Sequence, residues 1–549
     1  MSALSPLNRA FNQIPKRAEK QESPQLHETF VDSGVVDVIN TVDHQVIYGR
    51  RGTGKTHALS YLGSEVAANG DLALYIDLRT IGSANGLFDP QSAPITERAA
   101  RLLVDLLGQL HESLLNAVLE DDSLMEDGRF VEKADQLIAA ITSVRVLGEV
   151  EQTAEAENKT GVRSGRSLEA RLTPQDVRVS GKISSDASSE DRGLHRETRK
   201  GTEQISLNFS DVAKALRELG GTLSSRRVWI LLDEWSSVPR DLQPYLAQFL
   251  TRCVLPVHKF TVKIAAIEQQ SNFRTQVDGV TIGIELGADM GAHVNLDDFL
   301  VFEGNEERAR SFFQGLFVKH LHSIAADTSN SALAQIPGSL VSAGFTDKRA
   351  FDELVRAAEG VPRDALYIAA KAAMKAGQGK ISVPLVRDAT HGWYHGDKMT
   401  GLTSLVEARR LLEWIITEVI RGKRARAFLV NSADSRDDLL LALFDARVLH
   451  ILRRGYSAQD HPGERFDIWG IDYGAYVDLV QTQSAPAGVL PIFDEEGVEA
   501  YADIDVPMQD HRAIRRAILD LQLFYGVEGE QGPDLGQQTE APAEAEPVG

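Results

Sequence analysis

Cysteine is nearly absent from this sequence, with a single residue, Cys253, among 549. One thiol cannot close a disulfide within the chain, and it cannot supply the paired cysteines of a zinc site. This scarcity excludes a disulfide-stabilised secreted fold and favours the reducing cytoplasm as the compartment.

Long apolar runs and an excess of basic residues are also missing. No stretch of 18 apolar residues occurs, and residues 1–20 lack the apolar stretch of a signal peptide, so we expect no membrane partner. The formal net charge of −21 excludes a protein that coats nucleic acid through its overall charge. A local basic surface is compatible with this charge, because residues 401–456 carry ten Lys or Arg against seven Asp or Glu.

A glycine-rich loop follows the apolar run Val46–Tyr48. Residues 49–56 read GRRGTGKT and match the pattern G-x-x-x-x-G-K-[ST]. In such a loop, backbone N–H groups and the N-terminus of the next helix surround phosphate oxygens. The pattern predicts that Lys55 reaches the β- and γ-phosphates of ATP and that Thr56 ligates Mg²⁺. The expected nucleotide-contacting residues are Gly49, Arg50, Arg51, Gly52, Thr53, Gly54, Lys55, Thr56 and His57, the last with helix packing as its alternative role.

Two acids close a second apolar run. Asp233 and Glu234 follow Val228–Leu232, as an element for nucleotide hydrolysis requires. Asp233 is expected to hold Mg²⁺ through its water shell, and Glu234 to orient and deprotonate the attacking water. The alternative is a turn or a helix cap.

Other charged residues are weaker candidates. Arg363 follows Gly360-Val361-Pro362 just inside a helix, where a cation is unfavourable with the helix dipole. An anion partner is therefore expected and the γ-phosphate fits, although a solvated arginine is the alternative. Asp297 and Asp298 lack a companion His or Glu at nuclease spacing, which disfavours a metal site there.

Taken in order, the phosphate loop, the Asp233-Glu234 strand, the Gly360–Arg363 motif and a C-terminal winged helix resemble the AAA+ ATPases of the origin-recognition-complex and replication-initiator type, the bacterial ORC-like P-loop ATPases. The resemblance covers roughly residues 26–480. It implies an ATPase core, a helical lid and a DNA-contacting winged helix, with Arg363 as the second sensor of bound nucleotide.

The sequence departs from this family at the first sensor, at the arginine finger and in the long insertion at 150–202. The first sensor is usually Asn or Thr, whereas here Gln269 is our candidate, with Glu268 and a structural turn as alternatives. The arginine finger is not identifiable, and Arg274 is only a candidate because it follows the same strand closely.

The predicted fold class is an α/β P-loop NTPase (AAA+) core with a parallel sheet, an α-helical lid and a C-terminal winged-helix domain. Helical periodicity covers 95–119, a short helix is expected over 28–41, and 448–456 is expected to pair with 465–471 as a hairpin. The expected segments are a polar N-terminal arm (1–25), the ATPase domain (26–303) with a flexible or weakly β-structured insertion (150–202), the lid (304–380), the winged helix (400–480), a C-terminal extension (481–525) and a disordered acidic tail (526–549).

Basic residues cluster in the expected winged helix. Arg424 and Arg426 follow one helix, and Arg453 and Arg454 lie late in the first strand of the hairpin. We expect these four residues to contact double-stranded DNA, with a solvated rim as the alternative.

These features predict a cytoplasmic ATP- and Mg²⁺-binding ATPase that contacts double-stranded DNA under nucleotide control, assembles as a homo- or hetero-oligomer and hydrolyses ATP slowly as an isolated chain. A signal-transducing P-loop switch of the STAND-like type, with a possible role in phage defence through protein partners, is the alternative. A third hypothesis is a nucleotide-gated DNA-binding protein that scarcely hydrolyses.

Overall fold

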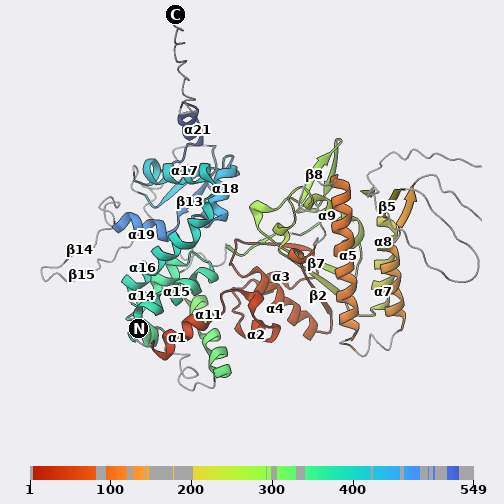
Figure 1. Cartoon of the computed structure of the whole chain (residues 1–549), viewed down its shortest axis with the longest axis horizontal. Helices are drawn as coiled ribbons and strands as arrows, with labels where there is room; N and C mark the ends of the chain where they lie inside the picture. Colours follow the sequence, from red (N-terminus) through yellow and green to blue (C-terminus); the bar gives the residue numbers. More distant parts are fainter. Residues whose placement is uncertain are drawn as a thin grey trace, which may run out of the picture. The chain divides into compact units, whose positions relative to one another are not determined.

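The computed structural model divides into two compact units, residues 1–383 and 384–549 (Figure 1), and we describe each by itself. Almost all of the expected insertion at 150–202, most of the extension at 481–525, and the tail beyond residue 530 lie outside the described residues. The described residues are 4–81, 94–119, 121, 128–141, 144–147, 177–178, 202–291, 293–297, 306–328, 340–421, 425–457, 463–481, 492–493, 499–500 and 516–530.

A five-stranded sheet forms the centre of the first unit. Its strand order is β10-β1-β7-β6-β2, and every neighbouring pair is parallel. All residues of β1, β6 and β7 are buried, as expected for parallel strands covered on both faces. The parallel α/β core predicted from the sequence is therefore confirmed. The strands are β1 (Gln45–Tyr48), β2 (Leu72–Asp77), β6 (Val228–Asp233), β7 (Phe260–Ala266) and β10 (Val294–Asn295).

Alternating residues along these strands build two separate cores. Ile230 and Leu232 face a large apolar cluster with α5, α7, α8 and α9, whereas Trp229 and Leu231 face a smaller cluster with α4. Strand side chains point alternately to opposite faces, which explains the division. The helices on the sheet are α4 (Lys55–Ala68), α5 (Ile95–Leu119), α7 (Gly128–Ile141), α8 (Phe209–Thr222) and α9 (Gln243–Phe249).

Helix α5 has the bounds that periodicity predicts, but the single short helix predicted over 28–41 is wrong. The chain forms α2 (Ser23–Thr29) and α3 (Val36–Ile39) instead. The Asp32 side chain accepts hydrogen bonds from the backbone N–H groups of Gly34, Val35 and Val36 at 2.9 to 3.2 Å. These hydrogen bonds hold residues 32–36 in a turn, which separates α3 from α2.

A group of helices follows the sheet, and the N-terminal segment packs against it. Phe11 of α1 makes edge-to-face contacts with Phe317 and Phe345, with ring centroids 5.5 and 6.2 Å apart. Asn8 donates hydrogen bonds to the carbonyl oxygens of Gly377 and Gly379, both at 2.9 Å. The helices are α1 (Pro6–Gln13), α11 (Glu306–Thr328), α13 (Leu340–Gly344), α14 (Lys348–Ala357) and α15 (Pro362–Ala376).

Short strands complete the first unit. An antiparallel hairpin of β8 and β9 follows β7, and a small sheet has the order β3-β5-β4. Among the described residues, no helix has the length and apolar character needed to cross a membrane. These strands are β3 (Val144–Leu147), β4 (Val177–Arg178), β5 (Thr202–Leu207), β8 (Arg274–Val277) and β9 (Val280–Gly283).

The second unit combines helices with a three-stranded antiparallel sheet of order β11-β13-β12. The expected hairpin is present as β12 and β13, while β11 was not anticipated. At its centre, the buried carboxylate of Asp472 accepts hydrogen bonds from Lys398 at 2.5 Å and His450 at 2.9 Å. The elements are α16 (Val383–Trp393), α17 (Val406–Trp414), β11 (Ala427–Asn431), α18 (Asp438–Asp445), β12 (Leu449–Tyr456), β13 (Phe466–Ile471), α19 (Tyr473–Gln481), β14 (Ile492–Phe493), β15 (Glu499–Ala500) and α21 (Leu521–Glu530).

Candidate functional site

The phosphate loop leaves β1 and enters α4. Gly52 and Gly54 have φ values of 89° and 97°, a left-handed backbone that glycine adopts without steric cost. Lys55 is the first residue of α4, and its ammonium donates hydrogen bonds to the carbonyl oxygens of Gly49 at 2.8 Å and Arg50 at 3.1 Å. The lysine side chain is therefore held inside the loop.

Acidic groups surround this buried lysine. Burial lowers the pKa of Lys55, and the nearby carboxylates of Glu234, Asp233 and Asp297 oppose that shift. These acids come from segments far apart in the sequence, and the sheet brings them to the end of β1 where the loop begins. The lysine and both acids of the second motif thus belong to one site.

A cavity of about 290 Å³ opens beside the loop. Lys55, Thr56, Glu234 and Arg363 all line it. Six Lys or Arg side chains and only two Glu side chains belong to its described wall, so the cavity suits an anionic ligand. Further loop residues in the wall are Arg51, Gly52, Gly54 and His57.

Asp233 and Glu234 lie at the carboxyl end of β6. Asp233 is fully buried, and its carboxylate accepts hydrogen bonds from the Tyr75 hydroxyl at 2.7 Å and from the Glu234 backbone N–H at 2.8 Å. Burial, together with the Asp233 charge, raises the pKa of Tyr75. Glu234 has a φ of 56°, a costly conformation for a non-glycine residue, and its side chain reaches the cavity that Asp233 does not line.

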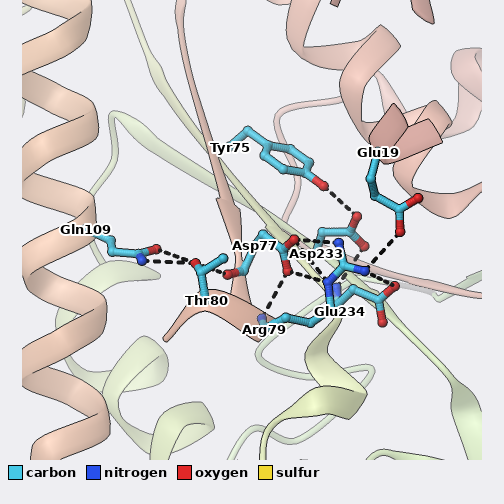
Figure 2. Close-up of polar contacts among 8 residues, drawn as sticks. All are labelled: Glu19, Tyr75, Asp77, Arg79, Thr80, Gln109, Asp233 and Glu234. Carbon is cyan, nitrogen blue, oxygen red and sulfur yellow. Dashed lines mark hydrogen bonds and ion pairs between the residues drawn. The ribbon is translucent and has the colours of Figure 1, made fainter. Parts of the chain in front are cut away.

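Arg79, which the sequence analysis did not identify, connects this acid pair to the N-terminal segment (Figure 2). Its guanidinium lies 2.6 Å from Asp77 Oδ2, 2.9 Å from Glu19 Oε1 and 4.0 Å from Glu234 Oε1. Burial alone would raise the pKa of Glu19, but hydrogen bonds from its backbone and from Arg79 leave that pKa lowered. Because Asp77 pairs with Asp233 across β2 and β6, Arg79 emerges beside Glu234.

Two contacts fasten the loop to the start of α15. The Arg363 backbone N–H donates to the Gly52 carbonyl at 3.3 Å, and the Arg50 side chain donates to the Glu359 carbonyl at 3.1 Å. Arg50 also forms an ion pair with Asp297, with Nε and Oδ1 2.7 Å apart. Since this carboxylate is occupied by arginine, Asp297 is engaged in fastening the loop, whereas Asp298 lies outside the described residues.

Residues 14–283 match the family model described as ORC-CDC6-like. These residues, just under half of the chain, are similar to the ORC-CDC6-like family. The prediction of an ORC-like P-loop ATPase is thereby confirmed. At the family level, this match also supports ATP binding and ATPase activity. Among solved structures, the chain is similar to a Walker-type ATPase of Pyrococcus abyssi, with 13% sequence identity and a TM-score of 0.34 over 85% of this chain and 99% of that chain. No curated protein is similar enough to match the chain.

Several predicted residues of the ORC-CDC6-like segment lie away from the cavity. Gln269 lies in the short turn Glu268–Gln270 after β7 and is not among the cavity-lining residues. Thr53 is buried, with its hydroxyl donating to the Arg50 carbonyl at 2.9 Å. Arg274 is exposed on β8 and lies 3.7 Å from Glu285. Gln269 therefore remains a prediction that the geometry does not strengthen.

The donor atoms at the nucleotide site suit a hard cation. Thr56 supplies a hydroxyl, and Asp233 and Glu234 supply carboxylates, which are the oxygen donors that Mg²⁺ prefers. Within the described ranges, no group of three His, Cys, Asp or Glu side chains could hold a metal ion by itself. Mg²⁺ usually combines one or two protein ligands with water and phosphate oxygens.

The basic residues expected to contact DNA lie in the second unit. Arg453 and Arg454 are exposed on β12, and the Arg453 guanidinium lies 6.0 Å from the Tyr456 ring centroid. Arg426 is only 7% exposed, and its guanidinium lies 5.6 and 5.7 Å from the rings of Tyr473 and Tyr476. A buried guanidinium cannot reach a phosphate at the surface, so the expectation for Arg426 is corrected. Arg424 lies outside the described residues.

Proposed function

We propose that the chain binds and hydrolyses Mg²⁺-ATP in the cavity beside the phosphate loop, and that bound nucleotide controls its contact with double-stranded DNA. The observation that carries this proposal is the convergence of Lys55, Thr56, Glu234 and Arg363 on one cationic cavity. These residues come from three segments separated by more than a hundred residues each. A general acid–base group, a phosphate-binding lysine and an arginine in one cavity are what phosphoryl transfer to water requires.

Each residue has a distinct role in this proposal. Lys55 binds the β- and γ-phosphates, and Arg363 contacts the γ-phosphate from α15. Glu234 accepts the proton of the attacking water, and its left-handed backbone aims the carboxylate into the cavity. When bound, Mg²⁺ would neutralise charge on the transferred phosphoryl group, held by Thr56 and, through water, by Asp233.

The helices around residues 304–380 would act as a lid. The Gly52–Arg363 and Arg50–Glu359 hydrogen bonds support this role, because they join the phosphate loop directly to the start of α15. A change in the loop on γ-phosphate release would therefore be transmitted to these helices without an intermediate contact.

The second unit would contact DNA as a winged helix. Arg453 and Arg454, which are exposed on the β12–β13 hairpin, support this function, because adjacent arginines at a surface can neutralise DNA phosphates. The test is a gel shift on duplex DNA with and without ATP, combined with light scattering to measure oligomer size. ATP-dependent retardation of the duplex is expected. ATP-dependent assembly without any DNA retardation would instead favour a switch that acts on protein partners.

A further inference from the structure

Asp233 differs from the other charged groups of the nucleotide site in its burial. Its side chain is fully buried and does not line the cavity, whereas the neighbouring Glu234 does. A buried carboxylate cannot turn freely to meet a metal ion, so the direction of its oxygens decides whether it can hold the water shell of Mg²⁺. The groups that fix this direction therefore contribute to the metal site.

Both oxygens of the Asp233 carboxylate accept a hydrogen bond. The Glu234 backbone N–H donates to Oδ1 at 2.8 Å, and the Tyr75 hydroxyl donates to Oδ2 at 2.7 Å (Figure 2). Among the described residues, Tyr75 is the one whose side chain donates to this carboxylate. An ionised carboxylate has about four acceptor positions, so each oxygen keeps the capacity to accept a further hydrogen bond from water.

The parallel sheet places Tyr75 beside Asp233. Asp77 is the direct partner of Asp233 where β2 pairs with β6, and Tyr75 is two residues earlier on β2. Residues two apart on a strand point to the same face, so the Tyr75 ring lies on the face that carries both acids. Tyr75 is 38% exposed. Its hydroxyl can therefore be removed without opening a cavity in the core.

Hydrogen bonds to metal-binding carboxylates affect how tightly the ion is held. Loss of such an outer partner typically weakens metal binding by about 10- to 100-fold, because the ligand is no longer held in one orientation. Mg²⁺ is especially sensitive to direction, since it requires near-octahedral geometry and keeps several water molecules. The donor to Asp233 Oδ2 is thus placed where it can control the metal and not the phosphates.

We propose that Tyr75 is a positioning residue for Mg²⁺ and that its hydroxyl holds the Asp233 carboxylate in the orientation that binds the water shell of the ion. This inference rests on the proposed Mg²⁺-ATP site. It adds a residue of β2 that lies outside the phosphate loop, the acid pair and α15. Tyr75 does not line the cavity, so it acts through Asp233 and contacts neither nucleotide nor metal.

The experiment measures the affinity of the full chain for a non-hydrolysable ATP analogue by calorimetric titration, once in Mg²⁺ and once in EDTA. The ratio of the two affinities gives the strengthening that Mg²⁺ provides. Tyr75→Phe is expected to reduce this ratio about tenfold, because it deletes only the hydroxyl. The affinity in EDTA should be unchanged, since Lys55 and the phosphate loop are intact.

Tyr245→Phe is the matched control. Tyr245 is a partly buried residue of α9 whose hydroxyl makes no hydrogen bond to a residue that the structure describes, so the ratio should stay at its unmodified value. Asp233→Asn tests the route, because it removes the carboxylate charge. If Tyr75 acts through Asp233, adding Tyr75→Phe to Asp233→Asn should cause no further loss of the ratio.

An unchanged ratio in Tyr75→Phe would overturn the inference, including the case in which affinity falls equally in Mg²⁺ and in EDTA. A further loss in the double variant would also overturn it, because Tyr75 would then act by another route. If the unmodified chain bound the analogue in neither condition, the proposed function itself would fail. The two failures are thus distinguishable.

Discussion

At the scale of single residues, the chemistry of the nucleotide site depends on the hydrogen-bond and ion-pair partners of its charged side chains. The Glu234 carboxylate lies 4.0 Å from the Arg79 guanidinium, whereas Asp77 and Glu19 lie closer to it. Glu234 therefore keeps a carboxylate at the cavity without a tight ion pair. Lys55, in contrast, is held by carbonyl oxygens of its own loop, which position the ammonium without neutralising it.

We predict that Glu234→Gln binds ATP with nearly unchanged affinity but hydrolyses it about 10² to 10⁴ times more slowly, since the amide cannot accept the proton of water. Phosphate release and ATP titration would measure the two effects. Lys55→Ala should instead lose ATP binding. Glu218→Gln on α8, where Glu218 pairs with Lys133 away from the cavity, is the control. Equal turnover in Glu234→Gln would remove Glu234 from its proposed role.

His320 should also make the fold sensitive to acid. Because burial lowers its pKa to about 3 in the folded chain and its pKa is about 6.5 in an unfolded one, the unfolded chain binds a proton between these pH values that the folded chain does not. This contribution to the free energy of unfolding is fully present above about pH 6.5. As the pH decreases below that value, it is lost by up to about 1.4 kcal/mol per pH unit.

We therefore predict that His320→Leu loses less stability than the unmodified chain on acidification from pH 6.5 to pH 4. Urea unfolding at several pH values would measure how the free energy of unfolding changes with pH. A stability change that the substitution causes equally at every pH does not affect this slope. Parallel profiles for the two proteins would contradict the assignment of this buried, neutral histidine.

At the scale of elements, the carboxyl ends of parallel strands assemble the site. Parallel strands deliver their following loops to the same edge of a sheet, so β1, β2 and β6 bring the phosphate loop, Arg79 and Glu234 together. Periodicity and apolar runs were sufficient to predict these strands and helix α5. They could not predict the break between α2 and α3, because it depends on one side chain, Asp32, whose hydrogen bonds to backbone N–H groups form a turn before α3.

The contact between the loop and α15 gives a prediction at this scale. A Cβ at Gly52 would lie 2.8 Å from the Cβ of Arg363 and 3.2 Å from Val361 Cγ1. We expect Gly52→Ala to destabilise the first unit by about 1–3 kcal/mol more than Gly70→Ala. Both glycines have a positive φ, but a Cβ at Gly70 meets nothing within 4 Å, so the control isolates backbone strain.

Thermal or urea unfolding of the two variants would measure this difference. Equal destabilisation would mean that α15 moves aside at no cost, and the proposed fastening between loop and lid would be withdrawn.

At the scale of the whole molecule, a strongly acidic chain carries a small basic surface. The net charge of −21 repels DNA at long range, so any duplex contact must be local and salt-sensitive. Arg426 is buried against Tyr473 and Tyr476. Of the four arginines expected to contact DNA, Arg453 and Arg454 are therefore the described residues that remain candidates.

We predict that replacing Arg453 and Arg454 together by Ala weakens duplex binding and reduces the slope of log affinity against log salt by about 2, as for two lost phosphate contacts. Fluorescence anisotropy over a salt series would measure the slope. Replacing Arg409 and Arg410 by Ala removes the same charge from exposed residues that pair with Glu413 and Glu407, and should leave the slope unchanged. A similar effect in both double variants would indicate net charge alone and not a contact.

The local chemistry of the site could be predicted from short stretches of sequence. Sequence patterns identify the phosphate loop, the acids at the end of β6 and the arginine at the start of α15. Each can be recognised because its function depends on neighbours within a few residues. The distant groups that meet them follow from the fold: Glu19 contacts Arg79, Asp297 contacts Arg50, and His320 lines the cavity. Such contacts join residues tens to hundreds of positions apart, and they form because burial of apolar strands and helices places their ends side by side.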